Sequence, residues 1–399
     1  MDFRLTKEQE ALKKEFEDFF REEMKNAPAC LERGGIEAAY ESDEGFAFHQ
    51  YMKKKLGEKG WISRAWPKEY GGQEGSLIEQ LIFSEVRMTY RAPGIDGWGV
   101  EMFAPTLLLF GTEEQKRRLL PPIAKGEVQY CQGWSEPDAG SDLANLGTSA
   151  VKDGDHYVIN GQKIWTTGAQ RADRMFMLAR TDPDSTRSRG LSVFHVQMDY
   201  PGIEVRPLLY MDRRHIYNEV FFKDVRVPEA DRVGPEGDGW KSTRETMNFE
   251  RSGIGAFAAG KRILEEIIEY AQNTNRDGKP LSDDPIVRRK LAQLHIDIEA
   301  GHSLSYNIAW LQQKGGMIMA ASAASEAKVF GSELSQRIAN YAMEIMGLYG
   351  QVEQSKWSPL GGTMVDAYMY APGGNIAAGS SEIQRNLIAW VGLGLPRFK

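Results

Sequence analysis

The stretch Glu245-Thr-Met-Asn-Phe-Glu-Arg-Ser-Gly-Ile-Gly-Ala-Phe-Ala-Ala-Gly260 lies near the start of the last helical region of the chain. It places a carboxylate, Glu250, and a guanidinium, Arg251, before nine uncharged residues, Ser252 to Gly260. A helix rich in glycine and alanine lets another backbone or a flat ligand approach closely, because few side-chain atoms hold it off. Taken alone, Glu250 is either a candidate base beside such a surface or a solvated acid that complements a helix dipole.

The composition is that of an ordinary globular protein with more than one domain. The chain has 399 residues, which is long for one hydrophobic core and predicts roughly two or three domains. Hydrophobic residues make up 41% and charged residues 26% of the chain, as is usual for soluble proteins. The net charge of −7, without a basic run, argues against a nucleic-acid partner.

The cysteines and the first residues indicate the compartment. Cys30 and Cys131 are far apart in sequence, so a disulfide framework is not expected and a reducing compartment fits. The start, Met1-Asp-Phe-Arg-Leu5, is charged at once and lacks the apolar segment of an export signal. No apolar run approaches the ~20 residues needed to span a bilayer. We therefore expect a cytoplasmic protein without a membrane span.

Residues 1–126 are expected to form an all-helical domain. Thr6-Lys-Glu-Gln9 and Thr112-Glu-Glu-Gln115 both have the pattern of a capping box, in which the first and last side chains bond each other's backbone N–H. Each box predicts the start of a helix. Pro121-Pro122 and Gly126 are expected to end the second of these helices, because proline lacks the N–H that a helix interior needs.

From Glu127 the pattern changes to short runs rich in β-branched and aromatic residues, which predict a small β-barrel or sandwich domain over 127–237. These runs are His156–Gly161, Arg174–Arg180, Leu191–Gln197 and Glu219–Phe222. Helical periodicity returns after Gly239-Trp240 and continues through Ile268, and long helices are predicted at 285–313 and 317–347. The expected fold is α+β, with a helical domain, a β-domain and a C-terminal helical bundle over 238–399.

Three polar segments are candidate ligand sites. Ser135-Glu-Pro-Asp-Ala-Gly-Ser-Asp142 follows an apparent strand, and it is either a surface turn or a loop that holds a phosphate or the edge of a ring. Ile164-Trp-Thr-Thr-Gly168 places a large aromatic ring beside two hydroxyls, as core or as a ring platform. Gly374 to Arg385 leads into a final helix whose first turn is either a plain cap or an anion site.

Other kinds of site are not favoured. His295, Glu299 and His302 share one helix face, but no further ligand is suggested, so a solvated or subunit-contact face is preferred over a metal site. No Ser-His-Asp pattern with a sharp turn at the serine occurs, and no glycine-rich Rossmann or Walker sequence follows a strand. We therefore expect no bound metal and no nicotinamide dehydrogenase.

Taken together, five segments resemble the acyl-CoA dehydrogenase family of flavoproteins, in the family's order and over nearly the whole chain. They are Gly111-Thr-Glu-Glu-Gln-Lys116, Ser135-Glu-Pro-Asp-Ala-Gly-Ser-Asp142, Asn160-Gly-Gln-Lys-Ile-Trp-Thr-Thr167, Asp224-Val-Arg-Val-Pro228 and Gly379-Ser-Ser-Glu-Ile-Gln-Arg385. The resemblance implies a C-terminal four-helix bundle, FAD in a cleft between the β-domain and that bundle, and commonly a homotetramer.

The resemblance also implies roles for matching positions. Trp134 and Ser135 would line the isoalloxazine, Trp165 and Thr167 would pack against and bond the ring, and Arg276 would meet the FAD pyrophosphate from a neighbouring subunit. All positions implied to contact the cofactor are Trp134, Ser135, Ser141, Trp165, Thr167, Arg276, Gly347, Ser380 and Glu382. Those implied to face acyl-CoA are Ser141, Asn248 and Arg251. Glu344, where the family often has glutamine, and Trp390, where some members have an arginine, depart from the pattern.

The most informative departure concerns the catalytic base. Many family members have a glutamate immediately before the last motif, and this chain has Ala378 there. A smaller group, including the isovaleryl and long-chain enzymes, supplies the glutamate from the first bundle helix, one residue before an arginine, and Glu250 matches that placement. Removal of a proton α to a thioester needs a carboxylate as the base. Burial beside an apolar acyl chain raises the pKa of this carboxylate. We expect the backbone N–H at Ala378 to remain a donor to the thioester oxygen.

The resulting interpretation is a FAD-dependent acyl-CoA dehydrogenase that forms a trans-2,3-enoyl thioester and passes electrons to an electron-transfer flavoprotein. A flavin oxidase or monooxygenase on the same fold is one alternative. A non-catalytic subunit of a heteromeric dehydrogenase is another, suggested by Ala378. The acyl group is not specified by the sequence, although a base on the bundle helix favours bulky chains over short straight ones.

Overall fold

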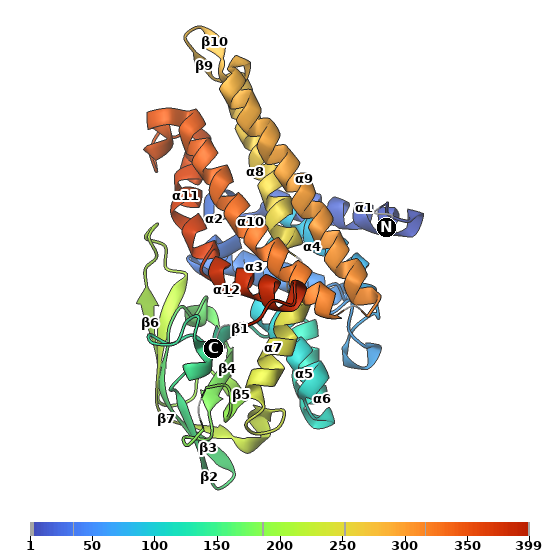
Figure 1. Ribbon diagram of the computed structural model, residues 1–399, viewed down its shortest axis with the longest axis vertical. Coiled ribbons are helices and arrows are strands. Elements are labelled where there is room, and N and C mark those ends of the chain that lie inside the picture. The colour runs from blue at the N-terminus through green and yellow to red at the C-terminus, as the bar shows by residue number, and fades with distance from the viewer. Residues whose placement is uncertain (1–3, 35, 186, 251–252, 316, 398–399) are drawn as a thin grey trace. The chain divides into compact units, whose positions relative to one another are not determined.

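The computed structural model describes residues 4–34, 36–185, 187–250, 253–315 and 317–397 (Figure 1). The chain forms two compact units. The helical unit consists of Met1–Ile36, Ser76–Ala92 and Arg251–Lys399, and the sheet unit consists of Glu37–Gly75 and Pro93–Glu250. The helices of the first predicted domain are thus divided between the two units.

The long helices α8, α9 and α10 of the helical unit run alongside one another, and a small hairpin joins the end of α8 to the start of α9 (Figure 1). The elements of the helical unit are α1 (Lys7–Glu23), α2 (Ala29–Gly34), α4 (Leu77–Thr89), α8 (Ile254–Asn273), α9 (Pro285–Gln313), α10 (Met317–Met346), α11 (Thr363–Gly374), α12 (Ser381–Leu387), and the hairpin strands β9 (Asn275–Arg276) and β10 (Lys279–Pro280). The two long helices lie where the periodicity predicts them.

Helices α8 to α11 share one apolar core, which makes them the predicted bundle. Helices α8, α9 and α10 each bury apolar residues three or four positions apart, the spacing that lines one helix face, and α11 adds Met364. The members of this core include Leu264, Ile267, Leu291, Leu294, Ile298, Leu334, Ile338, Ala342, Ile345 and Met364. At Gly301 a side chain would start 2.0 Å from the ring of Phe257, so only glycine allows α9 to pack this closely on α8.

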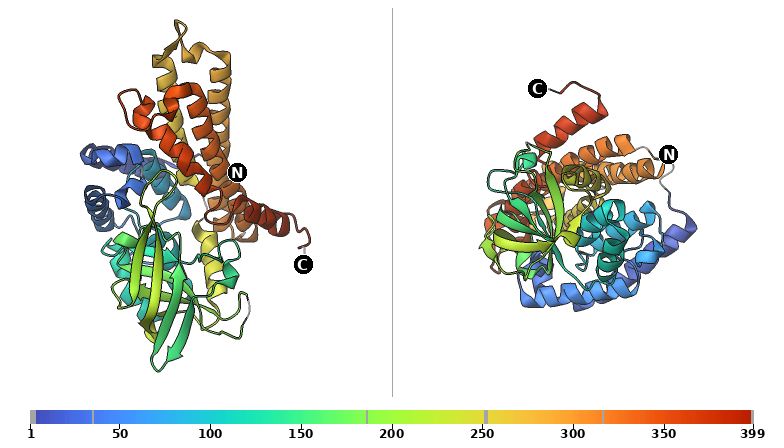
Figure 2. Two further views of the ribbon diagram at one scale, coloured as in Figure 1. Left: turned by 90° about the vertical axis from the view of Figure 1, so that its left-hand side faces the viewer. Right: turned by 90° about the horizontal axis from the view of Figure 1, so that it is seen from below.

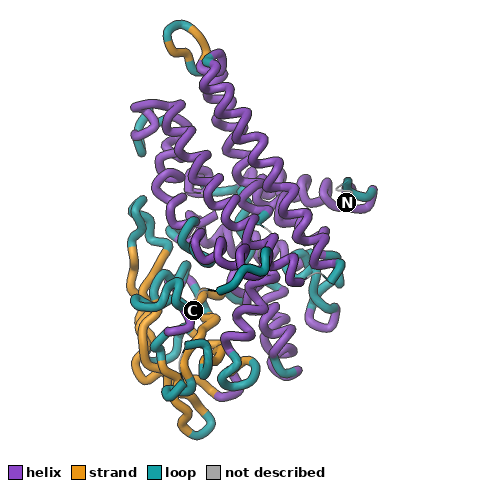
Figure 3. The backbone as a smooth tube through the Cα atoms, in the orientation of Figure 1, coloured by secondary structure: helices purple, strands orange, loops and turns teal. Residues whose placement is uncertain are grey.

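The sheet unit combines an eight-stranded sheet with four α-helices, and Figures 2 and 3 show its strands from different sides. Its strands are β1 (Tyr130–Gly133), β2 (Ser149–Asp153), β3 (His156–Lys163), β4 (Arg174–Arg180), β5 (Leu191–Gln197), β6 (Ile203–Leu208), β7 (Tyr217–Pro228) and β8 (Arg232–Val233). Its helices are α3 (Asp43–Glu58), α5 (Ala104–Phe110), α6 (Glu113–Ala124) and α7 (Gly239–Glu250). The strand order is β6-β7-β3-β2-β4-β5-β8, and β1 pairs in parallel with β4.

Both predicted capping boxes are confirmed. The side chain of Thr6 accepts from Gln9 N–H at the start of α1, and Thr112 accepts from Gln115 N–H at the start of α6. The predicted end of α6 at Gly126 is confirmed, since Gly126 follows the cap residue Lys125 with a φ of 71°, but Pro121 and Pro122 lie inside the helix instead of ending it. Their carbonyl groups still accept from Lys125 and Glu127 N–H, so the helix continues for a further turn although two N–H donors are missing.

The residues after Gly239 have a helical periodicity that suggests one helix, but in the structure they form two. Helix α7 ends at Glu250, and α8 begins at Ile254. Gly253 precedes α8 with a φ of 70°, in the left-handed region where glycine carries no steric cost. A glycine in a helical sequence thus precedes α8, close to the point after Glu250 where the sheet unit ends.

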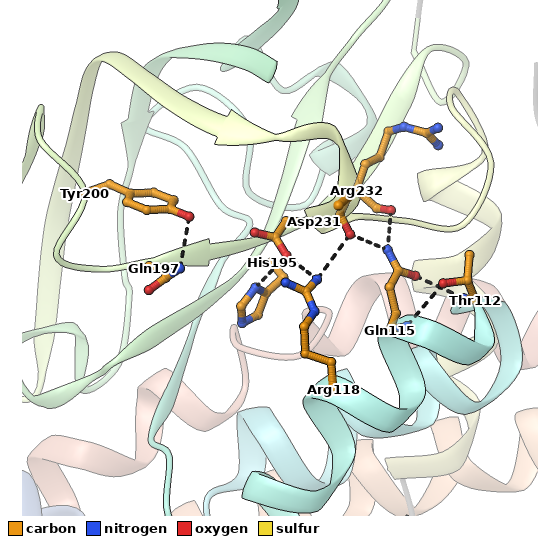
Figure 4. Close-up of polar contacts among 9 residues, drawn as sticks. Thr112, Gln115, Arg118, His195, Gln197, Tyr200, Asp231 and Arg232 are labelled. Atoms are coloured by element: carbon orange, nitrogen blue, oxygen red, sulfur yellow. Dashed lines mark hydrogen bonds and ion pairs between the residues drawn. The ribbon is translucent and has the colours of Figure 1, made fainter. Parts of the chain in front are cut away.

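A buried polar cluster fixes α6 to the sheet (Figure 4). Arg118 of α6 donates to the carboxylate of Asp231 at 2.6 Å, and His195 Nδ1 of β5 lies 3.5 Å from the same carboxylate. Burial would raise the pKa of Asp231, but His195 and Arg118 lower it below its usual range. Beside the contact between Arg118 and Asp231, Gln115 Nε2 donates to the carbonyls of Ala230 and Arg232. The cluster therefore joins three segments that are distant in sequence.

Glu85 of α4 joins three helices of the helical unit. Its side chain is 13% exposed and receives Lys13 Nζ of α1 at 3.1 Å and the Tyr306 hydroxyl of α9 at 2.9 Å, while His302 Nε2 lies at 3.3 Å. Burial would raise the pKa of Glu85, but the contacts with His302 and Lys13 hold it at about 2. His302 thus pairs with Glu85, while His295 and Glu299 are exposed on α9.

The described residues were searched for two further features. None of their helices is both long and apolar enough to cross a membrane. No group of three or more His, Cys, Asp or Glu side chains in this part of the chain is arranged to hold a metal ion.

We predict that Glu85→Gln destabilises the protein by about 3 kcal/mol at pH 7, since the native pKa lies well below that of an unfolded glutamate. A depressed native pKa adds stability above the unfolded pKa, and that stability is lost as pH falls toward the native pKa. Urea unfolding followed by circular dichroism at pH 7 and at pH 4 should show the difference between variant and wild type shrinking at the lower pH.

Glu299→Gln is the matched control, because Glu299 makes an exposed pair with Lys261 at 3.4 Å. Such surface pairs contribute about 0–1 kcal/mol. Equal unfolding midpoints for the Glu85→Gln and Glu299→Gln proteins would contradict the role given to Glu85.

Candidate functional site

Two candidate segments of the sheet unit lie side by side. Trp134 and Ser135 follow β1, and Ile164 follows β3. The N–H of Ile164 donates to the carbonyl of Ser135 at 2.9 Å. The structure therefore brings the predicted flavin contacts Trp134 and Ser135 next to the segment that carries Trp165 and Thr167.

Two polar atoms of these segments are buried without a protein partner. They are the indole Nε1 of Trp134, whose residue is 6% exposed, and the hydroxyl of Thr166, whose residue is fully buried. Buried polar atoms are normally hydrogen-bonded, so each exception needs an explanation. A ligand with donor and acceptor atoms on a flat ring would satisfy both. The resemblance assigns the bond to the flavin ring to Thr167, the residue next to Thr166.

Trp165 has an unusual backbone and an exposed ring. Its φ is 60°, a left-handed value that is uncommon for a residue with a large side chain, and 51% of its surface is exposed. The ring meets Tyr217 edge to face at 5.7 Å. Reciprocal hydrogen bonds between the backbone of Thr166 and Asn218 hold the segment in place. Strain of this kind is found at ligand-binding positions, where the surrounding structure maintains it.

Ser141 lies on the exposed loop that continues from Ser135. The start of this loop is a tight turn, because Glu136 and Ala139 exchange both backbone hydrogen bonds. The loop therefore leaves Ser141 accessible to a ligand.

In the helical unit, the predicted positions around α12 form a second group. Ser380 caps α12 by accepting from Ile383 N–H, and Glu382 is exposed in the first turn. Ala378 has a φ of 53°, and its carbonyl accepts from Gln384 Nε2 at 2.8 Å. The turn at Ala378 is thus held in a left-handed conformation by its own helix.

A polar cavity of about 430 Å³ lies between α10 and the start of α12. Glu333 and Arg337 of α10 line one side, and Asn375, Ser381 and Glu382 line the other. The hydroxyl of Ser381 and the Oδ1 atom of Asn375 are buried without a protein partner. Hydroxyl, amide and charged groups together suit the hydroxyls of a ribose or a similar polar ligand.

Arg276 and Gly347 are also brought together. Arg276 Nη2 donates to the carbonyl of Ile345 at 2.9 Å, and it lies 3.9 Å from where a side chain at Gly347 would start. Gly347 has a φ of 62°, which glycine adopts freely. Glu344, the departure noted above, forms an ion pair with Lys290.

Glu250, the predicted catalytic base, is the last residue of α7, and the structure describes only its backbone. The side chains of Glu250 and Asn248, and the whole of Arg251, lie outside the described residues. The remaining site residues therefore form two groups, one in each unit.

Both groups fit the parts of FAD that the resemblance assigns to them. Two indoles, an orphaned N–H and an orphaned hydroxyl suit a flat ring with polar edges. Arg276, the polar cavity and the glycine turn suit the pyrophosphate and the sugar of a dinucleotide. The first group would hold the flavin ring and the second would hold the ADP half.

Three family models match the chain in order. They are the acyl-CoA dehydrogenase N-terminal domain over residues 6–127, the middle domain over residues 131–225 and the C-terminal domain over residues 237–393. Among curated proteins, acyl-CoA dehydrogenase FadE26 of Mycobacterium tuberculosis (strain ATCC 25618 / H37Rv) is 36% identical over 400 residues, which covers 98% of each chain.

Solved structures agree with this match over the whole chain. A chain of the ChsE4-ChsE5 complex from Mycobacterium tuberculosis is 36% identical, with a TM-score of 0.88 and 100% of both chains covered. A chain of the Tcur3481-Tcur3483 steroid ACAD is 31% identical, also with a TM-score of 0.88 and 100% of both chains covered. The chain therefore belongs to the acyl-CoA dehydrogenase family, whose members are FAD-dependent oxidoreductases.

Proposed function

We propose that this acyl-CoA dehydrogenase uses Glu250 to remove a proton from the α-carbon of a bulky, ring-bearing acyl-CoA, which becomes the trans-2,3-enoyl thioester. FAD, when bound, would supply the acceptor for the hydride that leaves the β-carbon. The proton passes from the α-carbon to a carboxylate oxygen of Glu250, and the electron pair of the broken C–H bond forms the new double bond. The substrate thus loses one proton and one hydride.

The observation that carries the assignment of the base is Ala378. An alanine cannot take up a proton, so a carboxylate must come from elsewhere in the chain. Glu250 stands at the end of α7, directly before Arg251, which is the placement that the resemblance gives for the alternative base.

The thioester oxygen needs hydrogen-bond donors while enolate charge develops on it. A backbone N–H survives replacement of its side chain, so Ala378 can still supply one. The left-handed φ of 53° and the hydrogen bond from Gln384 to the Ala378 carbonyl fix the orientation of this turn. One donor of this kind contributes roughly 3–4 kcal/mol of transition-state stabilisation.

The choice of a ring-bearing acyl group rests on a relative. The Tcur3481-Tcur3483 protein is a steroid ACAD and is similar to this chain over its whole length. Placement of the base at Glu250, at the end of α7, instead of at residue 378 also favours a bulky acyl chain over a short straight one. We extend the proposal to an electron-transfer flavoprotein as the acceptor, and rapid peroxide formation in air would instead indicate an oxidase.

For assembly we propose a homo-oligomer, in which Arg276 meets the FAD of a neighbouring subunit. A heteromer is the second candidate, since both similar structures are named for two different chains. Native mass spectrometry of the purified protein separates the two, because a homo-oligomer forms from this chain alone.

We predict that Glu250→Gln keeps its bound FAD but loses bleaching of the flavin by acyl-CoA. Loss of a general base lowers a rate by about 10²–10⁴-fold. Anaerobic stopped-flow absorbance of the oxidised flavin band measures this rate directly. Glu265→Gln, at an exposed position of α8, is the control and should keep the wild-type rate.

A second variant makes this prediction sharper. Ala378→Glu in the Glu250→Gln protein restores a carboxylate at the position many family members use, and it should recover part of the bleaching. Unchanged bleaching in Glu250→Gln itself would exclude Glu250 as the base.

We predict that a CoA thioester of a steroid side chain or another fused-ring acid bleaches the flavin faster than butyryl-CoA does. The difference should be at least about tenfold in kcat/KM, because one or two unfilled apolar subsites cost this much. A panel of acyl-CoAs measured by flavin bleaching gives the ranking. Preference for butyryl-CoA would contradict the proposed substrate class without affecting the family assignment.

A further inference from the structure

Lys163, the last residue of β3, is a fully buried lysine beneath the two flavin-side segments. Its side chain is 0% exposed. The Nζ atom donates to the carboxylate of Glu136 at 2.7 Å and to the carbonyl of Trp134 at 3.1 Å. A single ammonium group therefore contacts the residues on both sides of Ser135.

Glu136 extends this contact to a further segment. Its carboxylate accepts from the backbone N–H groups of Gly147 and Thr148, at 2.6 and 2.9 Å. Burial would raise the pKa of Glu136, but the charge and hydrogen bond of Lys163 lower it. The pair thus connects the end of β3, the loop after β1 and the approach to β2.

A buried ion pair is a costly way to stabilise a sheet. Replacement of both charged residues by apolar side chains of similar volume commonly gives equal or higher stability, because it avoids the desolvation of two charges. The strand partner of Lys163 on β7 is the apolar residue Val220, so the site is suited to such a side chain. The position of the pair therefore calls for a role other than stability.

The surroundings indicate what that role is. Lys163 fixes the carbonyl of Trp134, while the next residue, Ile164, donates to the carbonyl of Ser135. Trp134 and Thr166, on either side of this junction, carry the two buried polar atoms without a partner. Their orientation toward a ligand depends on two backbone segments that the Lys163–Glu136 pair holds together.

We propose that Lys163 is a positioning residue for FAD, which acts with Glu136 to hold the Trp134-Ser135 and Ile164–Thr167 segments in the arrangement that receives the flavin ring. The inference rests on the proposed flavin contacts of these segments. Lys163 itself does not react, and its effect passes through the backbone of Trp134 and Ser135.

The pair gives this role a pH dependence. Burial lowers the pKa of Lys163 to about 8, although the charge of Glu136 opposes that shift. Above this pH the ammonium loses its charge and the ion pair is broken, so FAD affinity should fall. The stability of the apoprotein should not fall with it. An unfolded lysine keeps its proton up to its ordinary pKa of about 10.4, so this group makes folding more favourable as pH rises from 8.

The test is Lys163→Met, measured by reconstitution of the apoprotein with FAD and quenching of flavin fluorescence. We expect the Kd for FAD to rise about 10–100-fold, by analogy with the loss of metal affinity when residues that orient metal ligands are removed. The wild-type Kd should rise several-fold between pH 7 and pH 9.5, and the variant should show no such step. Lys163→Met alone leaves Glu136 without its cation and should lower the thermal stability of the apoprotein. Lys163→Met combined with Glu136→Gln removes both charges and should keep the wild-type stability while FAD affinity stays low.

Lys152→Met is the matched control, because Lys152 of the neighbouring strand β2 makes an exposed pair with Glu229 at 2.6 Å. It should leave the Kd and its pH step unchanged. If Lys163→Met does not fold, the Kd of Glu136→Gln for FAD and the pH dependence of the wild-type Kd test the proposal instead. Wild-type FAD affinity in Lys163→Met, or no step near pH 8 in the wild type, overturns the proposal. FAD binding is measured without substrate, so it tests the role of Lys163 even if the proposed dehydrogenation does not occur.

Discussion

The hydrogen bond from Ile164 N–H to the Ser135 carbonyl is the contact on which the sheet half of the site depends. It joins residues 29 positions apart and places one tryptophan on each side of the junction. Lys163 and Glu136 flank this bond with a buried ion pair, and Asn218 fixes the backbone of Thr166 beyond it. A strained, exposed Trp165 is tolerated because its neighbours on both sides are held.

The helical half depends on a different constraint. The apolar core of α8 to α11 aligns the long helices, and Gly301 allows α8 and α9 to pack closely. Arg276 and Gly347, two predicted cofactor contacts, lie at helix ends, and the cavity beside Ser381 lies against α10. A rigid bundle and polar helix ends are a suitable support for a charged dinucleotide, because the binding groups need not be ordered when the ligand arrives.

Local signals in the sequence predicted the fold well, whereas contacts across the chain were not predictable. The capping boxes at Thr6 and Thr112 need only four residues each, so they could be read directly. The Lys163–Glu136 and His195–Asp231 contacts join distant segments and leave no periodic pattern. Pro121 and Pro122 were expected to end α6 but lie inside it, because the effect of a proline on a helix depends on which hydrogen bonds the neighbouring turns still make.

The proton-transfer step can be measured apart from the flavin. A CoA thioester whose β-carbon carries no hydrogen cannot give up a hydride, but its α-protons can still be removed and returned. In D₂O, deuterium should enter the α-position with the wild-type holoprotein and not with Glu250→Gln, as mass spectrometry of the thioester would show. Equal deuterium uptake with both proteins would contradict Glu250 as the base.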